Sequence, residues 1–224
     1  MNRKDQIRMK RYLPFVIIAA ALVAAVSVGF MMFRSSQPQT SANLTPAGGS
    51  GATPGAAISK GAVLIDEFGD YQCPPCGALH PILKTLKSEY GDRIQIAFHQ
   101  FPLTQLHSHA LEAAYAASAA GLQGKFWQMH DLLYETQSAW SQVGDFRPVL
   151  INYAHQLGLD VPRFTRDMDG LQVMTLVEED TQRANAAGVN STPTVFINGR
   201  LIPNENMTIE GLRKEINQRL PVSP

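Results

Sequence analysis

Residues 62–99 follow the pattern of a strand, a helix and a second strand. The run Ala62–Phe68 is short and apolar, which is typical of a buried strand. Apolar residues then recur at helical spacing over Leu79–Tyr90, and Arg93–His99 alternates between polar and apolar residues as a strand does. Two strands joined through one helix in so short a stretch are parallel, with a right-handed crossover. The sequence therefore predicts an α/β fold.

Helical patterning dominates the next part of the chain, up to about Gly188. The expected helices are Ser108–Gly121, Lys125–Thr136, Phe146–Leu157, Pro162–Asp169 and Leu171–Ala187. Asn198-Gly199 between two apolar runs predicts a hairpin of Thr194–Ile197 and Arg200–Ile202. A last amphipathic helix is expected over Ile209–Leu220, with Thr208 as its cap. This order predicts a mixed sheet interrupted by a helical insertion at about residues 104–190.

The amino-terminal part of the chain differs in composition from the rest. Leu13–Phe33 is a run without a charge, long enough for a helix to cross a bilayer, and it comes after a basic segment, residues 1–12. The positive-inside rule places that segment in the cytoplasm and exports the chain beyond residue 34. No A-x-A site comes after residues 13–33, so an uncleaved signal anchor is favoured over a cleaved signal peptide.

Residues 34–60 are rich in Ser, Thr, Pro, Gly and Ala, which predicts a flexible linker between the anchor and an exported domain, residues 61–224. The formal net charge of the whole chain is zero, which argues against a nucleic-acid binder that acts through a general basic field. The expected location is the bacterial cytoplasmic membrane, with a single pass and the domain on the periplasmic or extracytoplasmic side.

The only two cysteines of the chain lie in Cys73-Pro74-Pro75-Cys76, where the first strand meets the helix. Two-residue spacing lets the sulfurs meet across the first helical turn, and the helix amino terminus favours a thiolate. A purely structural disulfide would close almost no loop, and a zinc site would need further ligands. The pair is therefore predicted to be redox-active, with Cys73 as the nucleophile and Cys76 as the resolving thiol.

Four segments in order give the chain a resemblance to a known family. They are Glu67–Cys76 (EFGDYQCPPC), Phe98–Leu103 (FHQFPL), Gln123–Gln137 (QGKFWQMHDLLYETQ) and Gly188–Arg200 (GVNSTPTVFINGR). Together they resemble the DsbA-like thiol:disulfide oxidoreductases of the thioredoxin superfamily, in their membrane-anchored bacterial branch. The resemblance covers residues 60–220 and implies a thioredoxin-like fold with a helical insertion.

The resemblance also implies roles for individual residues. Cys73 and Cys76 would form the redox-active disulfide, and Thr192-Pro193 would form the cis-proline loop that holds a substrate strand beside it. An ordinary proline at the start of a strand is the alternative for Pro193. Glu67 matches the buried acid that this family often places beneath the cysteines, and a buried carboxyl could exchange a proton with Cys76.

Two neighbouring acids are weighed against Glu67 for this role. Asp66 faces the opposite side of the strand and is the alternative proton carrier, whereas Asp70 is expected to be a turn or cap residue. DsbA-type oxidants often carry a His between the cysteines, and this chain has Pro74-Pro75 instead. The helix amino terminus is therefore expected to be the main device that stabilises the Cys73 thiolate, and the strength of oxidation is left open.

The expected function is the introduction of disulfides into exported proteins by exchange, without a flavin, haem or metal in this chain. The resemblance implies reduced exported proteins as substrates and a quinone-coupled membrane oxidoreductase as the recycling partner. The alternatives are an extracytoplasmic reductase or isomerase and, from another class, a non-catalytic thioredoxin-like binding or chaperone module. The six histidines are not expected to form a second site, although His80, one turn after Cys76, is close enough to influence the cysteines.

Overall fold

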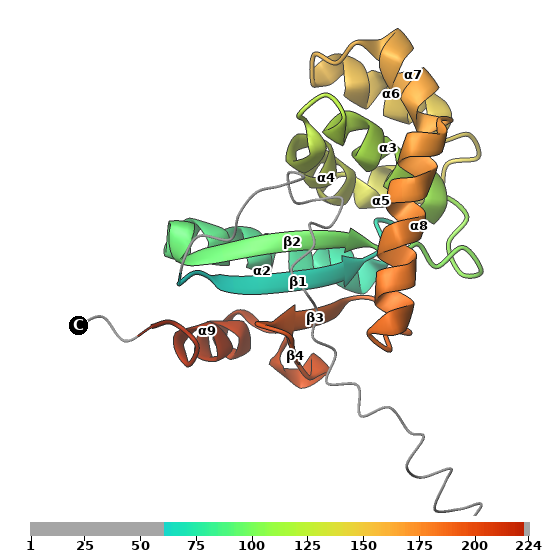
Figure 1. Ribbon diagram of the computed structural model, residues 1–224. Helices are drawn as coiled ribbons and strands as arrows, with labels where there is room; N and C mark the ends of the chain where they lie inside the picture. The colour runs from blue at the N-terminus through green and yellow to red at the C-terminus, as the bar shows by residue number, and fades with distance from the viewer. Residues whose placement is uncertain (1–60, 222–224) are drawn as a thin grey trace, which may run out of the picture. The chain divides into compact units, whose positions relative to one another are not determined.

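The computed structural model describes residues 61–221, and these residues contain a four-stranded sheet in the order β2-β1-β3-β4 (Figure 1). The strands are β1 (Val63–Gly69), β2 (Ile94–Gln100), β3 (Thr194–Ile197) and β4 (Arg200–Leu201). β1 pairs in parallel with β2, and β3 pairs antiparallel with both β1 and β4. The predicted α/β fold, with a parallel pair and a later hairpin, is confirmed.

The helix between the parallel strands is α2 (Pro74–Tyr90). Pro74 and Pro75 lie in its first turn, where a backbone N–H has no partner within the helix and its loss costs nothing. The helix ends at Gly91, whose φ of 56° is a conformation that glycine adopts without a steric penalty. The strand–helix junction therefore places Cys73 at the N-cap position of α2.

Two hydrophobic layers hold the sheet. On one face, apolar residues of β1 and β3 pack against α2 and against α9 (Ile209–Asn217) in a cluster that includes Ile65, Leu83 and Leu212. On the other face, Phe68 and Phe196 pack against Ala184 of α8 (Leu171–Ala186). Successive residues of β1 therefore face different helices, which decides the surroundings of the acids Asp66 and Glu67.

The predicted helical insertion is present between β2 and β3 (Figure 1). Besides α8 it consists of α3 (Ala110–Gly121), α4 (Phe126–Glu135), α5 (Gln137–Trp140), α6 (Arg147–Gln156) and α7 (Val161–Met168). The helix α5 was not predicted, because four residues are too few to show a period. A third hydrophobic cluster fills the insertion and includes Cys76, so residues of the inserted helices pack against the cysteine pair.

The carboxyl-terminal elements differ from the prediction only in their ends. Asn198 and Gly199 both have positive φ, as a two-residue hairpin turn requires, and the side chain of Thr208 caps α9 by accepting from the backbone N–H of Gly211. Two short 3-10 turns, 91–93 and 204–206, complete the described elements. No helix among residues 61–221 is both apolar and long enough to span a bilayer. The expected membrane segment, residues 13–33, and linker lie outside the described residues.

Candidate active site

Cys73 and Cys76 lie where β1 passes into α2, and both carry free thiols. The backbone N–H of Cys73 donates to the carbonyl of Asp70 at 3.1 Å, and its carbonyl accepts the first helical bond, from Gly77, at 3.1 Å. Cys73 keeps 5% of its surface exposed, whereas Cys76 is fully buried in the cluster of the helical insertion. Cys73 is therefore the more exposed of the two cysteines.

The two thiols have opposite acidities. The pKa of Cys73 is lowered from 9.0 to about 6, chiefly by a hydrogen bond from the thiol of Cys76, and then by Thr192 and the backbone N–H of Cys76, against burial and the charge of Asp70. Burial raises the pKa of Cys76 well above its ordinary value, and the neighbouring sulfur and Glu67 raise it further. The pair therefore holds one thiolate at neutral pH, located on Cys73.

The expectation that the helix amino terminus is the main device stays a prediction. The backbone N–H of Cys76 contributes to the low pKa of Cys73, but less than the thiol of the same residue does. The pattern of the sequence located the helix end and gave no measure of how close the two sulfurs come.

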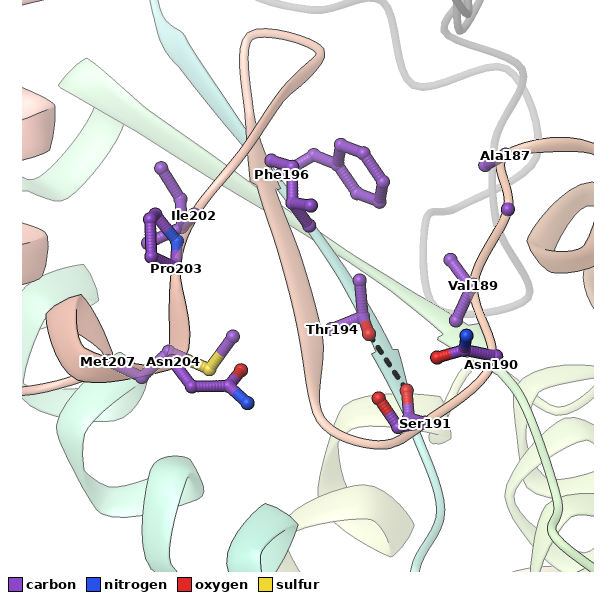
Figure 2. A pocket seen from close by; sticks show the side chains of 12 residues that line it. Ala187, Val189, Asn190, Ser191, Thr194, Phe196, Ile202, Pro203, Asn204 and Met207 are labelled. Carbon is purple, nitrogen blue, oxygen red and sulfur yellow. Dashed lines mark hydrogen bonds between the residues drawn. The ribbon is translucent and has the colours of Figure 1, made fainter.

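The loop before β3 lies against the sulfur of Cys73. The peptide bond between Thr192 and Pro193 is cis, as the resemblance implies. The thiol of Cys73 donates to the carbonyl of Thr192 at 3.4 Å. The loop is held by the hydroxyl of Thr194, which donates to the carbonyl of Ser191 at 2.8 Å (Figure 2). Two elements that are 119 residues apart in sequence thus meet at the reactive sulfur.

Hollows open on both sides of this loop. One, of about 370 Å³, is lined by Pro75 and Ile82 of α2 and by Thr192 and Pro193. The other, of about 340 Å³, lies between the loop, the hairpin and the end of α8, and Figure 2 shows Phe196 and Met207 among the side chains that line it. The first hollow is next to the cysteine pair and offers an apolar wall to a bound chain.

Glu67 is buried within the sheet on the face covered by α2. Only 2% of its surface is exposed, and its Oε1 has no hydrogen-bond partner among the described residues. Burial raises its pKa from 4.5 to about 8, although the charge of His99 acts in the opposite direction. Glu67 is therefore protonated at neutral pH, and its charge, when present, acts on Cys76.

Asp66 faces the other side of β1 and has a different partner. Its Oδ1 lies 3.0 Å from Nε2 of His99, whose Nδ1 lies 3.2 Å from Oδ1 of Asp180 on α8. Both carboxylates raise the pKa of His99 against the effect of burial. Asp66 is thus engaged in a buried ionic group under α8, and the alternation along the strand separates it from the cysteines.

The loop that carries Cys73 is supported by contacts that the sequence analysis missed. Nε2 of Gln137 donates to the carbonyl of Tyr71 at 2.7 Å and to that of Cys73 at 2.9 Å. A Cβ on Gly77 would lie 2.6 Å from Oε1 of Gln137, so the glycine leaves the space that this side chain needs. Gln137 is the last residue of one of the four segments that carry the resemblance, and its place in that segment was the signal that could have singled it out.

Asp70 is a turn residue, as expected, and it also joins three segments. Its Oδ1 accepts from the backbone N–H of Gln72 at 2.8 Å, and its Oδ2 accepts from the N–H of Leu103 at 2.9 Å. Nδ1 of His107 donates to the same Oδ2 at 2.7 Å. The Asp70 carboxylate is fully buried beside the active-site turn and raises the pKa of Cys73.

Two of the six histidines, which are not expected to form a second site, lie side by side. His80 on α2 and His130 on α4 have ring centroids 5.2 Å apart, and Asp131 lies beside them. The helical pattern placed each residue on its own helix but did not show that α2 and α4 pack together at these positions. Among residues 61–221 this is the one group of His, Cys and acidic side chains arranged as metal ligands would be.

The fold and the site together define a class of protein: a thioredoxin fold with a helical insertion and a Cys-X-X-Cys pair at the start of its first long helix. The family model described as Thioredoxin matches residues 58–218. The chain belongs to the thioredoxin family. Its cysteine pair lies at the start of α2 with both thiols free, and its fold is that of DsbA-like proteins.

Solved structures agree with this assignment. The chain superimposes on a thioredoxin-like oxidoreductase from Silicibacter pomeroyi DSS-3 with a TM-score of 0.58 and 25% identity, covering 71% of this chain and 86% of that one. The oxidoreductase DsbA from Xylella fastidiosa has the same fold, with a TM-score of 0.59, 16% identity and coverage of 73% and 88%.

Known sequences match over a shorter stretch. A Na(+)/H(+) antiporter NhaA 1 from Salinispora arenicola is 40% identical over 139 residues, which are 62% of this chain and 20% of the antiporter. The chain spans about a fifth of the length of the curated relatives it matches. The similarity therefore concerns a segment of those proteins and not the whole protein that each name describes.

Proposed function

We propose that the protein introduces disulfide bonds into exported proteins by donating a Cys73–Cys76 disulfide. The observation that carries the proposal is the difference in acidity between the two thiols, with the pKa of Cys73 at about 6 and that of Cys76 well above its ordinary value. A stable thiolate on Cys73 favours the reduced protein over its disulfide, and a disulfide that is readily reduced is an oxidant.

The exchange takes place in two steps. A substrate thiolate attacks the sulfur of Cys73, a mixed disulfide forms, and Cys76 leaves as a thiolate. A second substrate thiolate then attacks the substrate sulfur of the mixed disulfide and expels Cys73. The substrate loses two electrons and gains a disulfide, and the protein gains those two electrons as a pair of reduced sulfurs. The low pKa of Cys73 makes it the better leaving group in the second step.

Glu67 supplies the proton that the first step needs. The leaving sulfur of Cys76 has a raised pKa, so it takes up a proton readily. Glu67, with its pKa at about 8, holds a proton at neutral pH and is buried where its charge acts on Cys76. Transfer of this proton neutralises the Cys76 thiolate and moves the negative charge to Glu67, which regains its proton from solvent, and the reverse transfer accompanies reoxidation.

The substrate chain lies beside the Thr192–Pro193 loop. The carbonyl of Thr192 accepts from the thiol of Cys73 only while that thiol is protonated. A Cys73 thiolate or a disulfide has no thiol proton, so the carbonyl is then left to accept from a backbone N–H of an extended substrate. The hollow of about 370 Å³ beside Pro75 and Pro193 then receives an apolar side chain of the substrate.

The reaction takes place outside the cytoplasm. We place residues 1–12 in the cytoplasm, residues 13–33 in the membrane as a signal anchor, residues 34–60 in a flexible linker and residues 61–224 in the exported domain. The linker keeps the domain near one membrane face and raises its effective concentration toward a quinone-coupled membrane oxidoreductase, which restores the disulfide.

Two assays distinguish this function from its rivals. The oxidised protein should speed the recovery of activity by a reduced, denatured disulfide-containing enzyme, and Cys73→Ser should abolish that effect. A reductase would instead speed the precipitation of insulin by dithiothreitol far more than it speeds oxidative refolding. If Cys73→Ser kept both activities, neither would depend on the cysteine pair. That result would identify a binding or chaperone module and would refute the proposal.

A further inference from the structure

His80, His130 and Asp131 form a compact group at the contact between α2 and α4. One side-chain atom of each lies within 4.8 Å of the others. Nε2 of His80 is 3.5 Å from Oδ1 of Asp131, and the two imidazole rings meet edge to face. Neither cysteine takes part in the group, and the mechanism of disulfide exchange does not use it.

The nitrogen of His80 in this group has no hydrogen-bond partner. His80 is 7% exposed, and its buried Nε2 makes no hydrogen bond among the described residues, although Oδ1 of Asp131 lies 3.5 Å away as an ion-pair neighbour. A neutral imidazole nitrogen that makes no hydrogen bond can offer its lone pair to a metal ion.

The surroundings orient the two other side chains. Nδ1 of His130 lies 3.1 Å from the hydroxyl of Tyr71, which leaves Nε2 as the ring atom that can bind a ligand. Oδ2 of Asp131 accepts from Lys84 at 3.0 Å, so Oδ1 is left to face His80. Lys84 also pairs with Glu135 at 2.7 Å, and this carboxylate offsets the ammonium charge near the group.

We propose that His80, His130 and Asp131 bind a divalent transition-metal ion, for which Zn²⁺ is the probe. Two imidazole nitrogens and one carboxylate oxygen form a donor set that Zn²⁺ accepts, with water in the fourth position. A tetrahedral Zn²⁺ site needs ligand atoms about 3.3 Å apart, and Nε2 of His80 and Oδ1 of Asp131, at 3.5 Å, are already near that separation. Ca²⁺ and Mg²⁺ prefer oxygen ligands, so two nitrogens select against them.

The test uses the full-length chain without a polyhistidine tag and with Cys73 and Cys76 oxidised, because a reduced cysteine pair would bind Zn²⁺ itself. Isothermal titration with Zn²⁺, and elemental analysis after dialysis, should give about one ion per chain. His80→Ala and Asp131→Asn should each weaken Zn²⁺ binding at least about tenfold, since each removes a ligand. An excess of Mg²⁺ or Ca²⁺ should not displace the bound ion.

Glu135→Gln is the matched control. Glu135 lies on the same helix and shares Lys84 with Asp131, so its loss alters the local charge without removing a ligand. This variant should bind Zn²⁺ within about twofold of the unchanged chain, well inside the effect of losing a ligand. Because His80 is buried, circular dichroism must show that His80→Ala is folded. If His80→Ala does not fold, Asp131→Asn carries the test, since the side chain of Asp131 is 37% exposed. No saturable binding, or equal binding by Asp131→Asn and Glu135→Gln, would overturn the proposal.

Discussion

Nδ1 of His107 donates a hydrogen bond to Oδ2 of Asp70 across 2.7 Å, joining the segment before α3 to the turn that leads to Cys73. The same carboxylate accepts from the backbone N–H groups of Gln72 and Leu103. The negative charge of Asp70 acts on the sulfur of Cys73 and raises its pKa. One buried carboxylate therefore stabilises the active-site turn and opposes the acidity of its nucleophile.

Asp70→Asn is expected to lower the pKa of Cys73 below about 6, because it removes a negative charge while keeping the size of the side chain. The pH dependence of thiolate absorbance in the reduced protein measures the change. Asp92→Asn, at the exposed far end of α2, is the control and should leave the pKa of Cys73 as it is. A higher pKa of Cys73 in Asp70→Asn would contradict the role given to this charge.

Cys76→Ala is expected to raise the pKa of Cys73 from about 6 toward the ordinary value of a cysteine. The change removes the thiol that donates to Cys73 but keeps the backbone N–H of residue 76, which also lowers that pKa. The titration therefore separates the effect of the neighbouring thiol from that of the helix amino terminus. An unchanged pKa would assign the acidity of Cys73 to the backbone and refute the leading part given to the Cys76 thiol.

Glu67 is expected to make the folded protein less stable as the pH rises. Its pKa is raised from 4.5 to about 8 in the folded state, so the folded chain binds a proton that the unfolded chain releases between these values. The contribution is fully present below about pH 4.5 and is lost as the pH rises through about 8. At pH 7 this difference in proton binding has already lowered the free energy of unfolding by about 3 kcal/mol relative to pH 4.5.

Glu67→Gln removes this titration and should flatten the fall in the free energy of unfolding between pH 5 and pH 8, as urea denaturation measures it. It should also slow disulfide exchange, because the amide has no proton to give to Cys76. Glu205→Gln, at an exposed position, should keep both the slope and the rate of the unchanged chain. An equal slope in Glu67→Gln and the unchanged chain would show that Glu67 is ionised in the folded state.

Gln137→Ala is expected to lower the free energy of unfolding by about 1–3 kcal/mol, because it leaves the carbonyls of Tyr71 and Cys73 without their donor. Gly77→Ala should act in the same direction by displacing the Gln137 side chain, which a Cβ would meet at 2.6 Å. Gly144→Ala is the control, since a Cβ there meets nothing within 4 Å. Similar stability of the Gly77 and Gly144 variants would show that Gln137 has another position available.

Local patterns predicted the parts of the fold that depend on neighbouring residues. The parallel strands, the helix between them and the hairpin at Asn198-Gly199 are all encoded in the periods and turn residues of short segments. The helix α3 begins two residues later than predicted. The backbone N–H of His109 instead donates to Oε1 of Gln72, a contact with the active-site turn that no helical pattern contains.

The residues of the site that depend on distant contacts could not be predicted from the sequence. The spacing of Cys73 and Cys76 was enough to single out the cysteines, whereas Glu67 was favoured over Asp66 by the family resemblance. Asp70 and His107 are 37 residues apart, and only the path of the chain between β2 and α3 brings them together. The group at His80 depends in the same way on how the inserted helix α4 packs against α2.

The central claim is that the chain is an oxidant because Cys73 is stable as a thiolate, and the reduction potential of the Cys73–Cys76 pair tests it most directly. Equilibration of the full-length protein with glutathione buffers gives this value. With its Cys73 pKa of about 6, the account predicts a potential of about −230 mV, between those of thioredoxin (about −270 mV, with a cysteine pKa of about 7) and DsbA (about −120 mV, with a cysteine pKa of about 3.5). A value at or below that of thioredoxin would identify a reductase and contradict the account.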